Sequence, residues 1–154
     1  MKPYADTNFF TRLYLQLEDT PQALRLAEGA EEKAAPPLPV TWLHRVEFIN
    51  AVQQHVFVGL RGQIRVTAEQ AAIAMMTFRE DLAGGQFLHC PVLDLADLER
   101  HFEELSLRHT ARHGFRTYDL LHVSSALILK CDVFWSFDPK ASKLAALEGF
   151  KVRR

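Results

Sequence analysis

The segment VFWSFDP, residues 133–139, decides the fold class of this chain. The nearly continuous apolar run 133–137 is typical of a strand that is buried on both faces, as the strands of parallel sheets are. Asp138 followed by Pro139 is a favourable pair for a helix N-cap and first turn, so a helix is expected directly after the strand. A buried strand that leads straight into a helix is the repeating unit of α/β folds.

The same alternation of short strands and helices is expected along the rest of the chain. Turn residues, proline positions and apolar spacing predict these segments. Thr67 and Gln70 have the spacing of a capping box, and Gly59 and Gly62 mark the end of the preceding helix. The predicted strands are 3–5, 38–41, 87–93, 133–137 and 150–153, and the predicted helices are 7–17, 20–35, 42–60, 67–84, 94–113, 117–130 and 138–148. We therefore predict an α/β fold with three layers, α/β/α, around a central, mostly parallel sheet of four to five short strands, in one domain over residues 1–154.

The composition is that of an ordinary globular protein. Of the 154 residues, 48% are apolar and 24% are charged. The apolar runs are much shorter than the roughly 20 residues of a membrane helix, and the first residues do not resemble a secretory signal, so we expect a cytoplasmic protein without membrane contact. Cys90 and Cys131 lie outside any metal-binding spacing and are expected to be free, buried thiols.

Charge is unevenly distributed, although the net charge is only −1. Residues 1–104 carry 9 Lys/Arg and 15 Asp/Glu, whereas residues 105–154 carry 9 Lys/Arg and 4 Asp/Glu. The basic last third favours contact with a phosphate backbone. Solvated helix faces without a ligand explain the same charges equally well.

Four acidic residues are the candidate functional groups: Asp6, Glu47, Asp119 and Asp138. Asp6 and Asp138 directly follow strands, where open α/β sheets bind ligands, but each is also explained as a helix cap. Asp119 lies in a first helical turn, where the helix dipole favours a carboxylate. Glu47 lies within a helix among apolar neighbours, where a carboxylate is costly unless it is paired, for example with Arg45, or binds a metal ion.

A cluster of four carboxylates repels itself, and divalent cations commonly compensate that repulsion. Hard oxygen ligands suit Mg²⁺ or Mn²⁺. Such ions acidify a bound water and stabilise the attacking and leaving oxygens of a phosphodiester. If the four acids meet, they therefore predict a metal site for phosphodiester hydrolysis.

The sequence resembles the PIN-domain nucleases, and among them the VapC-like toxins of toxin–antitoxin pairs. The resemblance spans nearly the whole chain and depends on the order and spacing of four short motifs. These motifs are YADTN at 4–8, RVEF at 45–48, TYDLLHVSSA at 117–126 and WSFD at 135–138.

The resemblance implies a metal-dependent endoribonuclease that cleaves single-stranded RNA. Asp6, Glu47, Asp119 and Asp138 would then be the catalytic and metal-binding residues for Mg²⁺ or Mn²⁺. Asn8, Ser136 and Arg116 would border the site as supporting or phosphate-contacting residues, although ordinary hydrogen bonds and surface placement also explain them. The implied partners are RNA, a cognate antitoxin protein and a second copy of the chain in a homodimer.

Three alternatives stay open at this stage. The fold could serve as a catalytically silent RNA-binding PIN module. A receiver-type phosphoacceptor domain also clusters acids at strand ends, but it requires an adjacent acid pair and a late lysine that the motifs lack. The apolar residues of the helix pair 51–60 and 67–84, which are Val56, Phe57, Val58, Met75, Met76 and Phe78, could bind a partner, although core packing is the more frequent role of such residues.

Overall fold

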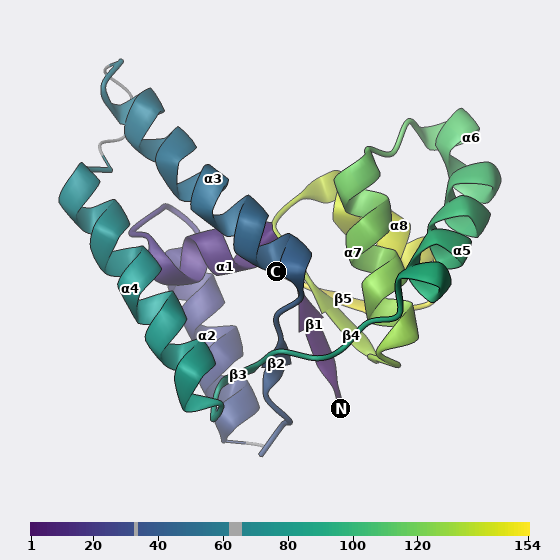
Figure 1. The fold of residues 1–154 in the computed structure, drawn as a ribbon, viewed down its shortest axis with the longest axis horizontal. Coiled ribbons are helices and arrows are strands. Elements are labelled where there is room, and N and C mark those ends of the chain that lie inside the picture. The colour runs from purple at the N-terminus through teal and green to yellow at the C-terminus, as the bar shows by residue number, and fades with distance from the viewer. Residues whose placement is uncertain (33, 62–65) are drawn as a thin grey trace.

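Five short parallel strands lie between two groups of helices in the computed structural model, which describes residues 1–32, 34–61 and 66–154. Strands β1 (Pro3–Ala5), β4 (Val133–Trp135) and β5 (Lys151–Arg153) form one parallel sheet in the order β1-β4-β5. Strands β2 (Leu38–Pro39) and β3 (Leu88–His89) pair in parallel beside it. Helices α1–α4 lie on one side of these strands and α5–α8 on the other (Figure 1). The predicted α/β fold is thus confirmed.

The helices follow the predicted order. The structure describes α1 (Thr7–Tyr14), α2 (Thr20–Glu31), α3 (Trp42–Gly59), α4 (Ala68–Gly84), α5 (Leu95–Leu105), α6 (Ala111–His113), α7 (Thr117–Ile128) and α8 (Pro139–Leu147), with a π-helical turn, Ser106–Thr110, between α5 and α6. The capping box at Thr67 and Gln70 is present, with hydrogen bonds in both directions.

Several boundaries differ from the prediction: α1 ends at Tyr14 rather than near residue 17, and β4 ends at Trp135 rather than at residue 137. Two other differences have a clear local reason. Helix α2 ends at Glu31 rather than near Ala35, where Ala34 has a φ of 50° and Pro36 disfavours helical backbone before it. Strand β3 is only two residues long, because Pro91 has no N–H with which to continue the ladder. Lys33, inside the predicted helix, and Gly62, the predicted end marker, lie outside the described residues.

Both faces of the strands are buried, as their apolar sequences predict. Tyr4 and Phe134 belong to the core beneath α5, α7 and α8, whereas Ala5 and Trp135 belong to the core beneath α1–α4. Neighbouring strand residues point to opposite faces, so one short strand contributes to two cores. The helices of the two sides are therefore held together largely through the strands between them.

The cysteine prediction was half wrong. Both cysteines are free, but Cys90 is exposed and Cys131 is half-buried. Cys90 follows the short β3 directly, where the chain has already left the sheet. None of the helices that the structure describes combines the length and apolar character needed to cross a lipid bilayer.

Candidate active site

The carboxyl ends of β1 and β4 bring Asp6 and Ser136 together. Ala5 and Trp135 are paired in the parallel register, so the residue after each strand lies at the same edge of the sheet. The Asp6 N–H still donates to the Trp135 carbonyl, at 3.1 Å. The Ser136 hydroxyl donates to Asp6 Oδ2 at 2.6 Å, and the Phe9 N–H donates to Asp6 Oδ1 at 2.9 Å. Asp6 is thus the N-cap of α1 and lies at the edge of the sheet where the carboxyl ends of β1 and β4 meet.

Burial makes Asp6 an unusual carboxylate. Its side chain is almost completely enclosed, and burial raises the pKa of Asp6 from 3.8 to about 6 despite the hydrogen bonds from Ser136 and Phe9. Asp138 adds to the increase by charge repulsion, whereas His122 opposes it. A cation placed beside Asp6 would relieve this penalty.

Arg116 connects the other two aspartates. Its guanidinium donates to both oxygens of Asp119, each at 3.1 Å, and reaches Asp138 Oδ2 at 2.6 Å. Burial alone would raise the pKa of Asp138, but Arg116 and the backbone N–H groups at the start of α8 outweigh it and hold the pKa below its ordinary value. The hydrogen bonds of the guanidinium to Asp119 and Asp138 in turn raise the pKa of Arg116. Arg116 therefore supplies a positive charge between two carboxylates of the pocket.

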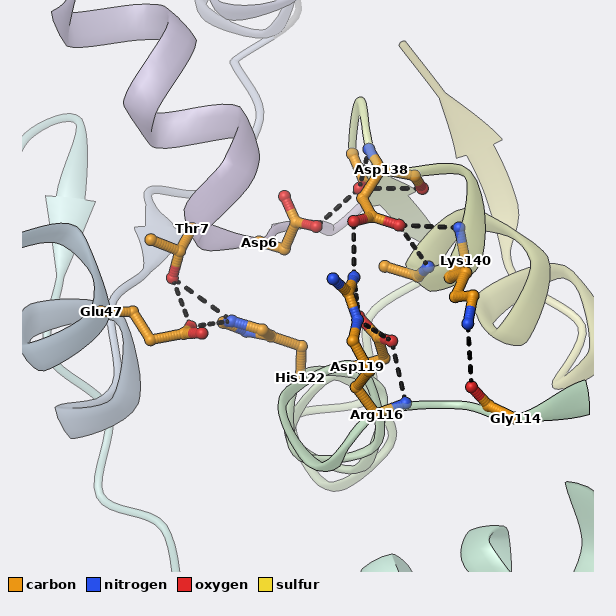
Figure 2. Close-up of polar contacts among 11 residues, drawn as sticks. Asp6, Thr7, Glu47, Gly114, Arg116, Asp119, His122, Asp138 and Lys140 are labelled. Atoms are coloured by element: carbon orange, nitrogen blue, oxygen red, sulfur yellow. Dashed lines mark hydrogen bonds and ion pairs between the residues drawn. The ribbon is translucent and has the colours of Figure 1, made fainter. Parts of the chain in front are cut away.

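Glu47 reaches the pocket from α3 and is held by one residue from its own side of the strands and one from the opposite side. Thr7 donates to Glu47 Oε2 at 2.7 Å, and His122 Nε2 on α7 lies 2.5 Å from the same oxygen. Burial on its own would raise the pKa of Glu47, but these two partners and the charge of Arg116 hold it below its ordinary value. Figure 2 shows this group on one side of Asp6 and the Arg116 group on the other.

All four predicted acids line a single pocket of about 550 Å³. Thr7, Asn8 and Arg116 line it as well, and Asn8 Oδ1 is buried with no hydrogen-bond partner among the residues that the structure describes. Ser136 is not in the pocket lining but behind Asp6, which it orients. Among the described residues, no three His, Cys, Asp or Glu side chains lie close enough together to hold a metal ion as they stand.

The sequence missed some of the contacts that arrange these acids. Glu47 was expected among apolar neighbours or paired with Arg45, but Val46 and Ile49 are exposed and Glu47 binds Thr7 and His122 instead. Thr7 was assigned no role at the site from the sequence. Its place beside Asp6 in the YADTN motif was the one available signal that its hydroxyl lies at the site.

No protein-family model and no curated protein matches the sequence. Solved structures do match. The Mycobacterium tuberculosis toxin VapC20, described as cleaving the sarcin–ricin loop, superposes with a TM-score of 0.67 at 17% identity over 99% of this chain and 100% of that one. This chain has the VapC fold. VapBC-1 from nontypeable Haemophilus influenzae matches with a TM-score of 0.62 at 13% identity, over 99% of this chain and 97% of that one.

At these identities the likeness concerns the fold. The VapC fold accounts for the parallel strands and for the helices on both sides of them, as the PIN resemblance implied. What the pocket does has to be argued from this chain's own residues.

Proposed function

We propose that this protein is a divalent-metal-dependent endoribonuclease of the VapC type, which cleaves single-stranded RNA and serves as the toxin of a toxin–antitoxin pair. The observation that carries the proposal is the meeting of Asp6, Glu47, Asp119 and Asp138 in one pocket from four separate segments of the chain. The VapC fold supports it, since one neighbour with that fold is described as a toxin that cleaves the sarcin–ricin loop.

The donor set of the pocket fits Mg²⁺ or Mn²⁺. All four acids offer hard carboxylate oxygens, and the buried amide oxygen of Asn8, to which no described residue donates, adds another hard oxygen ligand. Burial raises the pKa of Asp6, and a cation bound beside it would offset the cost of the buried charge. To complete the set, the exposed Arg116 side chain would have to release Asp119 and Asp138. A bound ion would acidify the attacking water and offset the charge that develops on the phosphodiester.

The protein's own groups would prepare the site for this chemistry. Ser136 and the Phe9 N–H fix the orientation of Asp6, and the N-terminal N–H groups of α8 fix Asp138. Arg116, once released from the aspartates, would be free to contact a phosphate of the RNA. Arginine suits this role because its planar fork binds carboxylates and phosphates alike.

The test is cleavage of labelled single-stranded RNA by purified protein with Mg²⁺ or Mn²⁺ and with EDTA. We expect cutting that requires the metal and is lost in Asp6→Asn and Asp119→Asn. A double-stranded RNA of the same sequence should be cut much less. Activity that persists in EDTA or in both variants would refute the proposal.

One observation favours a second candidate, an RNA-binding module without catalysis. Arg116 already forms ion pairs with both Asp119 and Asp138, so these two acids have a cationic partner without a metal ion. In the same experiment this alternative predicts retention of RNA on a filter without any cutting, whether or not metal is present.

We also propose a docking groove for the antitoxin between α3 and α4. This groove of about 380 Å³ includes the exposed apolar residues Trp42, Val46 and Ile49, with Arg45 and Arg79 beside them. The flanking arginines favour an occupant that combines apolar side chains with acidic ones. The neighbour that carries the joint name VapBC-1 supports an antitoxin as that occupant.

The predicted apolar residues of this helix pair divide between core and surface. Phe78 is buried, and Val56 and Met75 are partly buried against the core, as expected for packing. Phe57 and Met76 are about half exposed and stay available to a partner.

The groove is tested by co-purification with the product of a small adjacent upstream reading frame. Ile49→Asp should abolish co-purification, because it places a charge among apolar side chains, whereas the matched exposed change Leu107→Asp on the other side of the strands should not. If the two variants lose co-purification equally, or if neither loses it, this groove is not the docking site of the antitoxin. The homodimer stays a prediction, which the molar mass measured by light scattering tests.

A further inference from the structure

The hydrogen bonds around Glu47 point to a role for a residue that the sequence motifs left without one. His122 is 4% exposed and lies on α7, one turn after Asp119. Both of its ring nitrogens have partners: Nε2 lies 2.5 Å from Glu47 Oε2, and Nδ1 lies 2.9 Å from the Tyr4 hydroxyl. A buried imidazole with two partners cannot rotate without breaking at least one hydrogen bond.

The chemistry of the partners determines which atoms carry protons. A carboxylate oxygen only accepts, so Nε2 of His122 must carry the hydrogen directed at Glu47. A phenol is protonated at neutral pH, and the Tyr4 hydroxyl lies 2.9 Å from Nδ1, so it can donate to that nitrogen. The result is a directed chain from the Tyr4 hydroxyl through the imidazole to Glu47.

The neighbouring His44 does not compete for this chain. The Thr41 N–H donates to His44 Nδ1 at 3.0 Å, so His44 Nε2 carries the hydrogen that it donates to the Ala5 carbonyl, at 2.8 Å. Burial keeps the pKa of His44 well below its ordinary value. His44 is therefore a neutral, fully paired ring, and His122 is the histidine that controls the carboxylate.

The two oxygens of Glu47 are in different situations. Oε2 receives both the Thr7 hydroxyl and His122. Within the described part of the chain, no hydrogen bond reaches Oε1, although Glu47 lines the pocket. A glutamate side chain has three rotatable bonds, and holding one oxygen from two sides removes most of that freedom.

The contact also crosses the molecule. Helix α3 packs against α1 and α4, whereas α7 packs against α5 and α8. Because these helices lie on opposite sides of the strands (Figure 1), the contacts of His122 with Glu47 and with Thr7 join the two sides at the pocket. Without His122, Glu47 would be held to the pocket by Thr7 alone.

We propose that His122 is a positioning residue of the ion site: held from behind by Tyr4, it fixes Glu47 through Oε2 and leaves Oε1 free for a divalent ion. This inference rests on the proposed metal-dependent function. Groups that orient metal ligands typically change metal affinity by roughly 10–100-fold when they are removed.

The test compares Mn²⁺ affinity, measured by calorimetry or electron paramagnetic resonance, in His122→Gln and His122→Asn. The amide nitrogen of glutamine lies about where Nε2 of histidine does and can still donate to Glu47, whereas that of asparagine corresponds to Nδ1 and falls short of it. Both replacements are polar and neutral, so their effects on folding should be similar. We expect His122→Gln to bind Mn²⁺ within about threefold of wild type and His122→Asn at least about tenfold more weakly.

Two further variants complete the experiment. His101→Asn, on α5 with a single hydrogen bond to a backbone carbonyl, is the matched control and should bind Mn²⁺ like wild type. In a Glu47→Gln background, His122→Asn should cause no further loss, because the carboxylate it orients is already gone. Thermal unfolding of each variant establishes that it is folded.

The outcomes separate the two proposals. If wild type binds Mn²⁺ and the Gln and Asn variants bind it equally, the positioning role is refuted while the metal site stands. The same holds if His122→Asn weakens binding as much in the Glu47→Gln background as in wild type. If wild type itself binds no Mn²⁺, the proposed function fails and the positioning role fails with it.

Discussion

Replacing Asp6 by asparagine should make the protein more stable and at the same time inactive. The pKa of Asp6 rises from 3.8 to about 6 because the carboxyl is buried beside Asp138. A difference of about two pKa units corresponds to a cost of about 3 kcal/mol for keeping the ionised carboxylate folded at neutral pH. Asparagine has nearly the same shape and is an equally good N-cap, so it removes the charge without removing the cap.

The pH dependence follows from the sign of this pKa change. Between the unfolded and the folded pKa, the folded protein binds more protons than the unfolded chain, so wild-type stability falls as pH rises from about 4 to about 6. The penalty is complete above about pH 6 and absent below about pH 4. The advantage of Asp6→Asn should therefore be about 3 kcal/mol at pH 7.5 and roughly half of that at pH 5.

The measurement is urea unfolding of both proteins at these two pH values in EDTA. Asp138→Asn is the matched control, since the pKa of Asp138 is lowered by Arg116 and its loss should destabilise the protein at pH 7.5. If Asp6→Asn is less stable than wild type at pH 7.5, or if its advantage does not shrink at pH 5, then burial is not what sets the pKa of Asp6.

The remaining predictions concern ions, Arg116 and the last turn of the fold. Mn²⁺ should raise the melting temperature of wild type but not of Asp6→Asn, and EDTA should reverse the change; equal shifts in both proteins would place the ion elsewhere. Arg116→Gln should lower the unfolding free energy in EDTA by about 1–2 kcal/mol, since it leaves the buried Asp119 without the guanidinium that donates to it. The same variant should show a larger Mn²⁺-induced increase in melting temperature than wild type. Gly149→Ala should cost about 1 kcal/mol in urea unfolding, because φ at this position is 89°, and a neutral result would mean that the turn into β5 adjusts.

Local sequence was sufficient where a structural feature depends on adjacent residues. The run 133–137 predicted a buried strand, and Asp138-Pro139 predicted the start of the next helix, which begins at Pro139. Asp6 was placed correctly, directly after β1, whereas β4 ends at Trp135 and Asp138 lies three residues beyond it. Caps and buried strands are set by contacts within a few residues, so their patterns are visible in the sequence.

The surroundings of Glu47 were beyond such reasoning. Its sequence neighbours Val46 and Ile49 suggested an apolar environment, but both are exposed, and Glu47 faces the pocket. Which side of α3 is buried depends on how that helix packs against α1 and α4. The sequence identified the costly glutamate correctly, but the environment it inferred was wrong.

The sequence by itself determined the order of strands and helices and four acids at the positions where such a fold can use them. Only the tertiary structure decided how those acids are paired: Glu47 with His122, 75 residues away, and Asp138 with Arg116, 22 residues away. Strand ends and caps are short-range features, whereas these pairs form only when both sides of the sheet are in place. Because carboxylates respond strongly to which charge or donor lies within a few ångströms, the chemistry of the pocket depends on that final packing.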